Sequence, residues 1–198
     1  MTAPFALVLA AGGSSRFGSP KALALFKGRS LLELAVERVR AVVGEHFAVV
    51  VGSRADELLR TIHLSSNQIL RCDDWQAGHA ASLRFGITQI PEAAQGALIT
   101  LVDQPLIGAE DLSRLISAWE REPNNAAAAE FEEASGTRLL GAPCILPRAW
   151  FPEVERLSGD RGASALLRTA PHVLRVPMPS AAHDIDTPED LVCLAAQG

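Results

Sequence analysis

Continuous apolar runs and helically spaced apolar residues alternate along the chain. The runs 5–9, 47–51 and 97–102 have the length and composition of strands that are buried on both faces. Between the first two runs, apolar residues recur at helical spacing from Leu32 to Val43, which predicts a helix that begins near Ser30. Such alternation is typical of an α/β fold, in which a mostly parallel sheet carries helices on both faces.

The remaining chain divides into shorter elements. Pro91 ends one helix, because the residue before a proline avoids the helical conformation. Further strands are predicted at 68–72, 126–131, 138–145 and 173–176. Further helices are predicted at 56–62, 78–90 and 112–119, after Pro147, after Asp160 and from Pro188, and residues 73–77 are predicted to form a loop.

Composition narrows the class of protein. The 198 residues are 48% hydrophobic, which suits one domain over residues 1–198 with a sizeable core. The net charge of −5 argues against a nucleic-acid-binding surface. No apolar run reaches the roughly 18 residues of a membrane span, and no basic segment precedes the first run as in a signal peptide. Cys72, Cys144 and Cys193 are odd in number and widely spaced, which indicates free thiols and a cytoplasmic protein.

A loop rich in glycine and serine follows the first strand. Residues 9–21 read Leu-Ala-Ala-Gly-Gly-Ser-Ser-Arg-Phe-Gly-Ser-Pro-Lys. The backbone N–H groups of such a loop hold phosphates, and Arg16 and Lys21 add two cations; an ordinary strand-to-helix loop is the alternative. Gly18 and Lys21 are not adjacent, as a P-loop requires, and Ser14 replaces a glycine of the dinucleotide fingerprint. The second mismatch disfavours an NAD-dependent oxidoreductase.

Carboxylates are expected at the same edge of the sheet. Asp103 directly follows the strand 97–102, at the carboxyl edge where open α/β sheets bind ligands. A carboxylate there suits Mg²⁺, although an aspartate that caps a turn is the alternative. Asp184 and Asp186 are expected on one face of a strand that enters this edge. Two neighbouring carboxylates favour a site for a cation.

Three further segments carry polar residues in short, distinctive patterns. They are Trp-Gln-Ala-Gly-His-Ala-Ala-Ser-Leu-Arg-Phe-Gly at 75–86, Gly-Ala-Pro-Cys-Ile-Leu-Pro-Arg at 141–148 and Gly-Asp-Arg-Gly-Ala at 159–163. Asp160 also suits a helix N-cap. Arg161 could pair either with the phosphate of a bound substrate or with a surface carboxylate. His79 is interpreted as a helix-end residue without an acid–base role.

Together these segments resemble the MobA-like nucleotidyltransferases, and most closely the molybdenum cofactor cytidylyltransferases. The resemblance rests on the signature Leu-Ala-Ala-Gly-x-Ser-x-Arg-x-Gly-x-x-Lys at 9–21, on Asp-Gln-Pro at 103–105 and on the segment 75–86. His79 stands where the family usually has Met. The guanylyltransferase branch usually shows Ala-Gly-Gly where this chain has Ala-Ala-Gly at 10–12, so the resemblance leans towards CTP.

The resemblance implies a Rossmann-like three-layer α/β/α sandwich and roles for individual residues. The implied catalytic residues are Arg16, Lys21 and Asp103, and the implied Mg²⁺ ligands are Asp103 and Asp186, with Asp184 in reserve. The implied nucleotide-binding residues are Leu9, Ala10, Ala11, Gly12, Gly13, Arg16, Lys21, Gly78, Ser82 and Asp103. The implied acceptor-binding residues are Gly141, Pro143, Asp160 and Arg161.

The implied reaction moves CMP from CTP to the terminal phosphate of molybdenum-molybdopterin and releases pyrophosphate. Its expected partners are CTP, a phosphorylated pterin cofactor and a molybdoenzyme or its chaperone, with no nucleic acid and no membrane. Such transfer needs in-line positioning and charge neutralisation. The alternatives are GTP as donor, a sugar or alditol phosphate as acceptor, or a non-enzymatic maturation partner. Arg16, Lys21, Asp103 and Asp186 together favour an enzyme.

Overall fold

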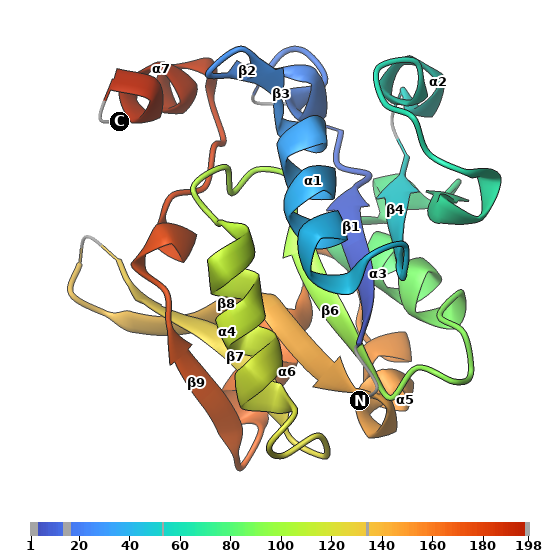
Figure 1. Ribbon diagram of the computed structural model, residues 1–198, viewed down its shortest axis with the longest axis vertical. Coiled ribbons are helices and arrows are strands. Elements are labelled where there is room, and N and C mark those ends of the chain that lie inside the picture. Colours follow the sequence, from blue (N-terminus) through green and yellow to red (C-terminus); the bar gives the residue numbers. More distant parts are fainter. Residues whose placement is uncertain (1–3, 14–16, 53, 134, 197–198) are drawn as a thin grey trace.

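One seven-stranded sheet forms the centre of the computed structural model, which describes residues 4–13, 17–52, 54–133 and 135–196. The strand order is β5-β4-β1-β6-β8-β7-β9 (Figure 1). The strands are β1 (Phe5–Ala10), β4 (Phe47–Val51), β5 (Ile69–Arg71), β6 (Gly96–Leu101), β7 (Ala126–Glu132), β8 (Arg138–Pro147) and β9 (Val173–Pro177). Only the two pairs that include β8 are antiparallel within this described sheet, which confirms the mostly parallel arrangement.

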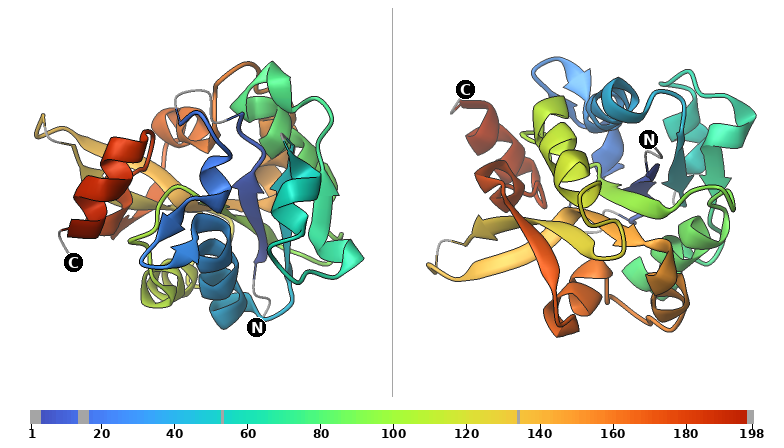
Figure 2. Two further views of the ribbon diagram at one scale, coloured as in Figure 1. Left: turned by 90° about the horizontal axis from the view of Figure 1, so that it is seen from above. Right: turned by 60° about the horizontal axis from the view of Figure 1, so that its bottom comes forward.

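Helices cover both faces of this sheet, so the chain forms the expected three layers. The helices are α1 (Leu31–Val43), α2 (Ala55–Leu59), α3 (His79–Thr88), α4 (Ala109–Trp119), α5 (Phe151–Glu155), α6 (Ala163–Thr169) and α7 (Pro188–Ala196). Helices α1 and α4 pack on one face, and α3, α5 and α6 pack on the other (Figure 2). Short 3-10 helices lie at 21–23, 66–68, 75–77, 148–150 and 179–182.

Local sequence explains why α1 begins where it was predicted. The Ser30 hydroxyl accepts a hydrogen bond from the Glu33 N–H, and the Glu33 carboxylate accepts one from the Ser30 N–H at 2.8 Å. This capping box satisfies two backbone donors that the first turn leaves free. The hydrogen bonds from Ser30 also lower the pKa of Glu33.

The core follows the alternation of side chains along each strand. Ala6 and Val8 of β1 point into the cluster beneath α1 and α4, whereas Leu7 points into the cluster beneath α3 and α6. All five residues of β4 are buried, as expected for a strand that is covered on both faces. The continuous apolar runs of the sequence therefore form the middle of the sandwich.

Two local features differ from the sequence predictions. A small hairpin joins β2 (Leu25–Phe26) and β3 (Arg29–Ser30) through Lys27 and Gly28, whose φ angles are 51° and 81°. A two-residue turn with positive φ angles is a common hairpin connection, but the flanking strands are too short to leave a periodic signal. The expected loop at 73–77 instead contains the 3-10 helix at 75–77.

The predicted strand through Asp184 and Asp186 is wrong. This segment belongs to no strand. The Ile185 N–H donates one hydrogen bond to the Asp103 carbonyl at 2.8 Å, and its buried side chain packs in a small cluster with Leu31 and Leu194. The buried Ile185 side chain and this backbone hydrogen bond hold the segment, whereas a strand would be held by the hydrogen bonds of the sheet.

The chain reverses its direction across the sheet between β1 and β6. These strands are neighbours, but the chain leaves β1 towards β4 and leaves β6 towards the β8-β7-β9 side. In open α/β sheets, such a switch point opens a crevice at the carboxyl ends of the two strands.

Among the described residues, no helix is long and apolar enough to cross a membrane.

Candidate active site

A first cavity of about 700 Å³ opens at the carboxyl ends of β1 and β6. Its lining includes every predicted nucleotide-binding residue that the structure describes. These are Leu9, Ala10, Ala11, Gly12, Gly13, Lys21, Gly78, Ser82 and Asp103. Arg16 lies outside the described residues, so its predicted role stays a prediction. The structure thus brings residues of three separate segments to one cavity.

Trp75 packs against the backbone on one side of this cavity. A Cβ atom added to Gly13 would lie 2.8 Å from the Trp75 ring. A Cβ added to Gly52 would lie 2.6 Å from the Trp75 side chain and 2.8 Å from the Ala11 carbonyl oxygen. All three distances are shorter than a real Cβ atom allows. Glycine at these positions therefore lets the indole pack directly against the loop after β1 and the end of β4.

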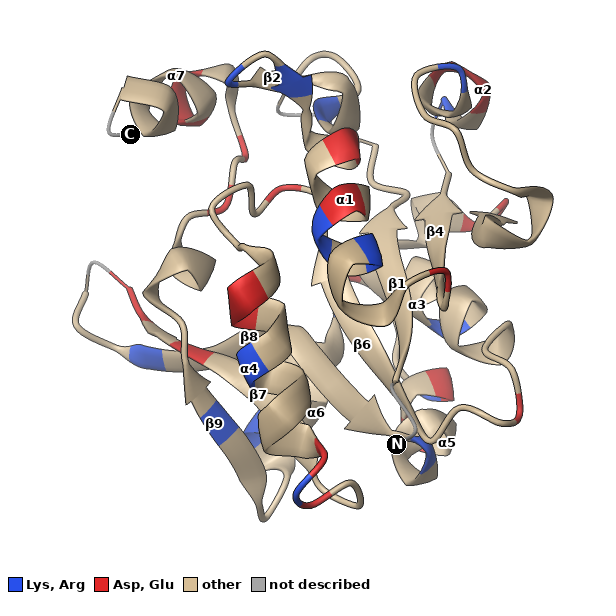
Figure 3. Cartoon of the chain, in the orientation of Figure 1, with Lys and Arg blue, Asp and Glu red and all other residues tan. Residues whose placement is uncertain are grey.

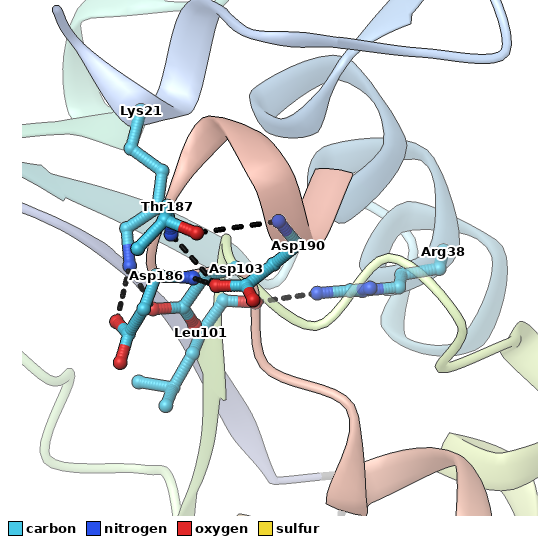
Figure 4. A network of polar contacts seen from close by, with 7 residues as sticks. All are labelled: Lys21, Arg38, Leu101, Asp103, Asp186, Thr187 and Asp190. Atoms are coloured by element: carbon cyan, nitrogen blue, oxygen red, sulfur yellow. Dashed lines mark hydrogen bonds and ion pairs between the residues drawn. The ribbon is translucent and has the colours of Figure 1, made fainter. Parts of the chain in front are cut away.

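Lys21 joins two carboxylates that are far apart in the sequence. Its Nζ lies 2.8 Å from Asp103 Oδ2 and 3.2 Å from Asp186 Oδ1 (Figure 4). The side chains of Lys21 and Asp103 are 15% and 20% exposed, whereas that of Asp186 is 42% exposed. The ammonium group offsets the repulsion between two carboxylates that face the same cavity.

The fold fixes Asp186 through the start of α7. The Asp190 carboxylate accepts hydrogen bonds from the N–H groups of Asp186 at 3.0 Å and Thr187 at 2.8 Å (Figure 4). The Thr187 hydroxyl accepts one in return from the Asp190 N–H. These backbone hydrogen bonds lower the pKa of Asp190. The capped helix start holds Asp186 opposite Asp103.

Arg38 of α1 holds the loop that carries Asp103. Its guanidinium donates hydrogen bonds to the carbonyl oxygens of Leu101, Gln104 and Ile107. Burial lowers the pKa of Arg38 to about 10, and the nearby charge of Asp103 partly opposes this shift. Sequence reasoning missed this residue. The available signal was a charged residue three positions after Ala35, on the buried face of a predicted helix.

Asp184, the other carboxylate of the C-terminal segment, faces a different cavity from Asp186. Asp184 lines a space beside the first cavity, whereas Asp186 lines the first. The pKa of Asp184 is raised to about 6, first because surrounding protein displaces water from its carboxyl group and then because Asp103 is negatively charged. The residue still reaches solvent. Of the two predicted alternatives, Asp186 is the one in contact with Lys21.

The second cavity, of about 690 Å³, lies against α6 and β8. It shares Leu9, His79, Leu101 and Asp160 with the first cavity, so the two spaces are neighbours. The predicted acceptor-binding residues Gly141 and Asp160 line it. Pro143 and Arg161 line neither of the two cavities.

One close backbone contact joins the start of α3 to the segment that precedes α6. The Ala80 N–H at the start of α3 donates to the Gly159 carbonyl at 3.0 Å. Gly78 has a φ of 100°, and a Cβ there would lie 2.6 Å from the same carbonyl oxygen. Glycine is therefore required at 78 by both backbone conformation and space.

Two observations bear on the predicted metal. Asp103 Oδ1 is buried and has no hydrogen-bond partner among the described residues. Within the same residues, no group of three or more His, Cys, Asp or Glu side chains is arranged to hold a metal ion. Mg²⁺ commonly binds through one or two carboxylates together with water and substrate phosphates. Asp103 and Asp186 fit that pattern, because Mg²⁺ would also satisfy the unpaired oxygen.

Comparison with known proteins shows which family the chain resembles. Nicotine blue oxidoreductase of Paenarthrobacter nicotinovorans is 29% identical over 192 residues, which cover 93% of each chain. A probable molybdenum cofactor guanylyltransferase of Rhodopirellula baltica is 29% identical over 191 residues, 93% of this chain and 88% of that protein. The manganese complex of Rv0371C from Mycobacterium tuberculosis superposes with a TM-score of 0.79 at 25% identity and covers 100% of both chains. The MobA-like NTP transferase domain matches residues 6–175, and the chain therefore belongs to this family of nucleotidyltransferases.

Proposed function

We propose that this nucleotidyltransferase moves CMP from CTP to the terminal phosphate of molybdenum-molybdopterin. An oxygen of the acceptor phosphate attacks the α-phosphorus of CTP. A new P–O–P bond forms, the bond between the α- and β-phosphates breaks, and pyrophosphate leaves with the bonding electron pair. The observation that carries the proposal is the convergence of Lys21, Asp103 and Asp186 beside the loop after β1.

The residues of the first cavity divide the work of binding and charge neutralisation. Gly12 and Gly13 line the cavity, and their backbone N–H groups would donate to the phosphates. Lys21 would stabilise the negative charge that grows on the leaving pyrophosphate. Asp103 and Asp186 would hold Mg²⁺. When bound, Mg²⁺ neutralises phosphate charge and orients the triphosphate. The manganese complex of the Rv0371C structure supports a divalent cation in this role.

The choice of CTP rests on sequence. Ala10-Ala11-Gly12 departs from the usual pattern of the guanylyltransferase branch, although one relative is named a probable molybdenum cofactor guanylyltransferase. GTP is therefore the first competitor to test. A sugar or alditol phosphate is the competing acceptor class. The further proposed partner is a molybdoenzyme or its chaperone, in the cytoplasm, where the three free cysteines would stay reduced.

Redox chemistry is the alternative that the oxidoreductase relative raises. The paired carboxylates and Lys21 favour transfer, because a hydride-transfer site has no need of two carboxylates around a cation. The sequence of the loop after β1 also lacks the dinucleotide fingerprint, because Ser14 replaces one of its glycines.

The test is a matrix of donors and acceptors with pyrophosphate release as the readout. CTP or GTP is combined with molybdenum-molybdopterin, a sugar 1-phosphate or an alditol phosphate, in the presence of Mg²⁺ or EDTA. We expect metal-dependent release with CTP and the pterin acceptor, at least about tenfold faster than with GTP. Equal rates with CTP and GTP would contradict the proposal that the enzyme prefers CTP. Pyrophosphate release only with a sugar or alditol phosphate would show that this compound, and not the pterin, is the acceptor.

A further inference from the structure

The segment 179–186 brings Asp186 to the first cavity without the support of a strand of the described sheet. Figure 3 shows acidic positions in this stretch, which leads into α7. The hydrogen bonds that Asp190 accepts fix Asp186 relative to its own helix, but they do not tie the segment to the sheet. The position of Asp186 opposite Asp103 therefore depends on contacts between this segment and the rest of the fold.

The side chain of Gln104 makes two of these contacts. Its amide nitrogen Nε2 donates hydrogen bonds to the carbonyl oxygen of Ala181 at 3.3 Å and to that of Ala142 in β8 at 3.1 Å. The same side chain makes a hydrogen bond with Asp184, which partly opposes the rise that burial causes in the pKa of that residue. Gln104 is only 3% exposed, so water competes little for these bonds. One buried amide group thus connects β8 with the segment 179–186.

Strand β8 offers Gln104 a carbonyl group that its neighbouring strands do not use. Within the described sheet, the pairing of β8 with β6 ends at Cys144, and its pairing with β7 passes from Gly141 directly to Cys144. Ala142 is therefore paired with neither strand, and an unpaired backbone carbonyl in the protein interior costs free energy. Because the amide group carries two N–H donors in one plane, the bond to β8 also fixes the direction of the second donor.

Asp103, the neighbour of Gln104, holds the same segment further along the chain. Its carbonyl oxygen accepts the hydrogen bond from the Ile185 N–H at 2.8 Å. Its carboxylate is linked to that of Asp186 through Lys21. Two consecutive residues of the loop after β6 thus attach the segment on both sides of Asp184. A shift of the segment would carry the Asp186 carboxylate with it.

We propose that Gln104 is a positioning residue, whose amide holds the segment 179–186 so that the Asp186 carboxylate stays opposite that of Asp103. Gln104 lines the second cavity, whereas both carboxylates line the first, so it acts on them through the segment. The inference rests on the proposed function for the metal ion that the carboxylates would share. Residues that orient metal ligands typically change metal affinity about 10–100-fold when they are replaced.

The test is Gln104→Met, because methionine keeps the approximate size of glutamine and loses both N–H donors. The matched control is Gln68→Met. Gln68 is also 3% exposed and donates a hydrogen bond to Glu45 at 2.7 Å, but it lines neither of the two cavities. Both variants should unfold at a lower temperature than the wild type, so two further measurements separate positioning from stability.

The first measurement is hydrogen exchange at the Ile185 amide, by nuclear magnetic resonance of the metal-free proteins. Gln104→Met should exchange about tenfold faster or more, because a segment that loses buried hydrogen bonds opens more often. Gln68→Met should stay within about threefold of the wild type. Gln104→Asn keeps the amide on a shorter side chain, should show a smaller increase, and replaces Gln104→Met if that variant does not fold. Unchanged exchange in both Gln104 variants would overturn the proposal.

The second measurement is the Kd for Mn²⁺ without nucleotide, by paramagnetic resonance of the free ion. Gln104→Met should raise this Kd about tenfold, and Gln68→Met should leave it within about twofold. Asp186→Asn is measured beside them as the loss of one ligand. If Asp186→Asn weakens Mn²⁺ binding and Gln104→Met does not, the positioning role is wrong. Faster exchange in Gln104→Met, with Mn²⁺ binding that Asp186→Asn does not weaken, would support the link that Gln104 makes and remove the metal role of Asp186 from the proposed function.

Discussion

The two halves of the sheet build their cavities from different parts of the chain. On the β5-β4-β1-β6 side, the glycine-rich backbone after β1 lines the first cavity, and Trp75 packs directly onto Gly13 and Gly52. On the β8-β7-β9 side, the long side chains of Arg138 and Arg168 reach the rim of the second cavity. Backbone contacts leave little room for substitution, whereas a rim side chain can change without moving the main chain. We therefore expect reaction chemistry to be sensitive on the first side and acceptor choice to be adjustable on the second.

The largest effect should come from the carboxylates of the first cavity. Asp103→Asn and Asp186→Asn should each lower the transfer rate by about three orders of magnitude, because an amide cannot neutralise a metal ion. The temperature of unfolding in EDTA should change little, because two effects of each substitution oppose each other. The variant loses one ion pair with Lys21, but it also loses repulsion of order 1 kcal/mol between the two carboxylates. Single-turnover pyrophosphate release measures the rates. Retention of more than a tenth of the wild-type rate by either variant would contradict the metal role.

Lys21 should have the next largest effect and a second signature. Lys21→Ala should lower turnover by about two to three orders of magnitude. Without nucleotide, the same variant should bind Mn²⁺ more tightly than the wild type, because the ammonium no longer occupies the space between Asp103 and Asp186. Paramagnetic resonance of free Mn²⁺ reports this binding, and Lys27→Ala in the β2–β3 turn is the matched control. Weaker Mn²⁺ binding by Lys21→Ala would show that the ammonium group does not compete with the metal ion for the two carboxylates.

Arg38 tests whether the first cavity depends on buried support. Arg38→Met should lower the free energy of unfolding by about 2–4 kcal/mol, because three carbonyl oxygens lose a buried donor. Arg38→Lys should recover part of this loss. Urea unfolding of the metal-free proteins gives the values. A loss below about 0.5 kcal/mol would show that the Asp103 loop holds its shape without the guanidinium.

Asp184 should give the smallest effect. Its pKa in the folded protein is about 6 against an ordinary value of 3.8, so the folded state binds the proton more tightly than the unfolded state. Stability therefore falls as the pH rises from about 4 to about 6. Asp184→Asn should remove this fall and add about 1 kcal/mol or less at pH 8 in EDTA, because solvent screens the group. Parallel pH–stability curves for the two proteins would exclude this explanation. Turnover should fall less than in Asp186→Asn.

Much of the fold could be predicted from sequence because the signals are local. Buried parallel strands leave continuous apolar runs, and a capping box marks the start of α1 at Ser30. The convergence of Asp103 with the loop after β1 followed from their shared position at the carboxyl ends of neighbouring strands. These predictions needed only strand order and direction.

The rest of the site depended on contacts that no local pattern encodes. Arg38 binds carbonyl oxygens more than 60 positions away, and backbone acceptors have no signature in sequence. Asp184 and Asp186 were expected on one strand face, but Ile185 anchors the segment and separates the two carboxylates between the cavities. The second cavity likewise forms where α6 packs on β8, a tertiary contact that brings residues 138–142 and 162–168 to one space.

The most direct test of the central claim follows the α-phosphate of CTP. The wild-type protein is incubated with Mg²⁺, molybdenum-molybdopterin and CTP labelled at the α-phosphate, and the Asp103→Asn protein is treated in parallel. We predict that the label moves to the pterin product in equal amount to the pyrophosphate released, and that Asp103→Asn moves about a thousandfold less in the same time. A folded wild-type protein that leaves the label in CTP, or equal transfer by both proteins, would contradict the account.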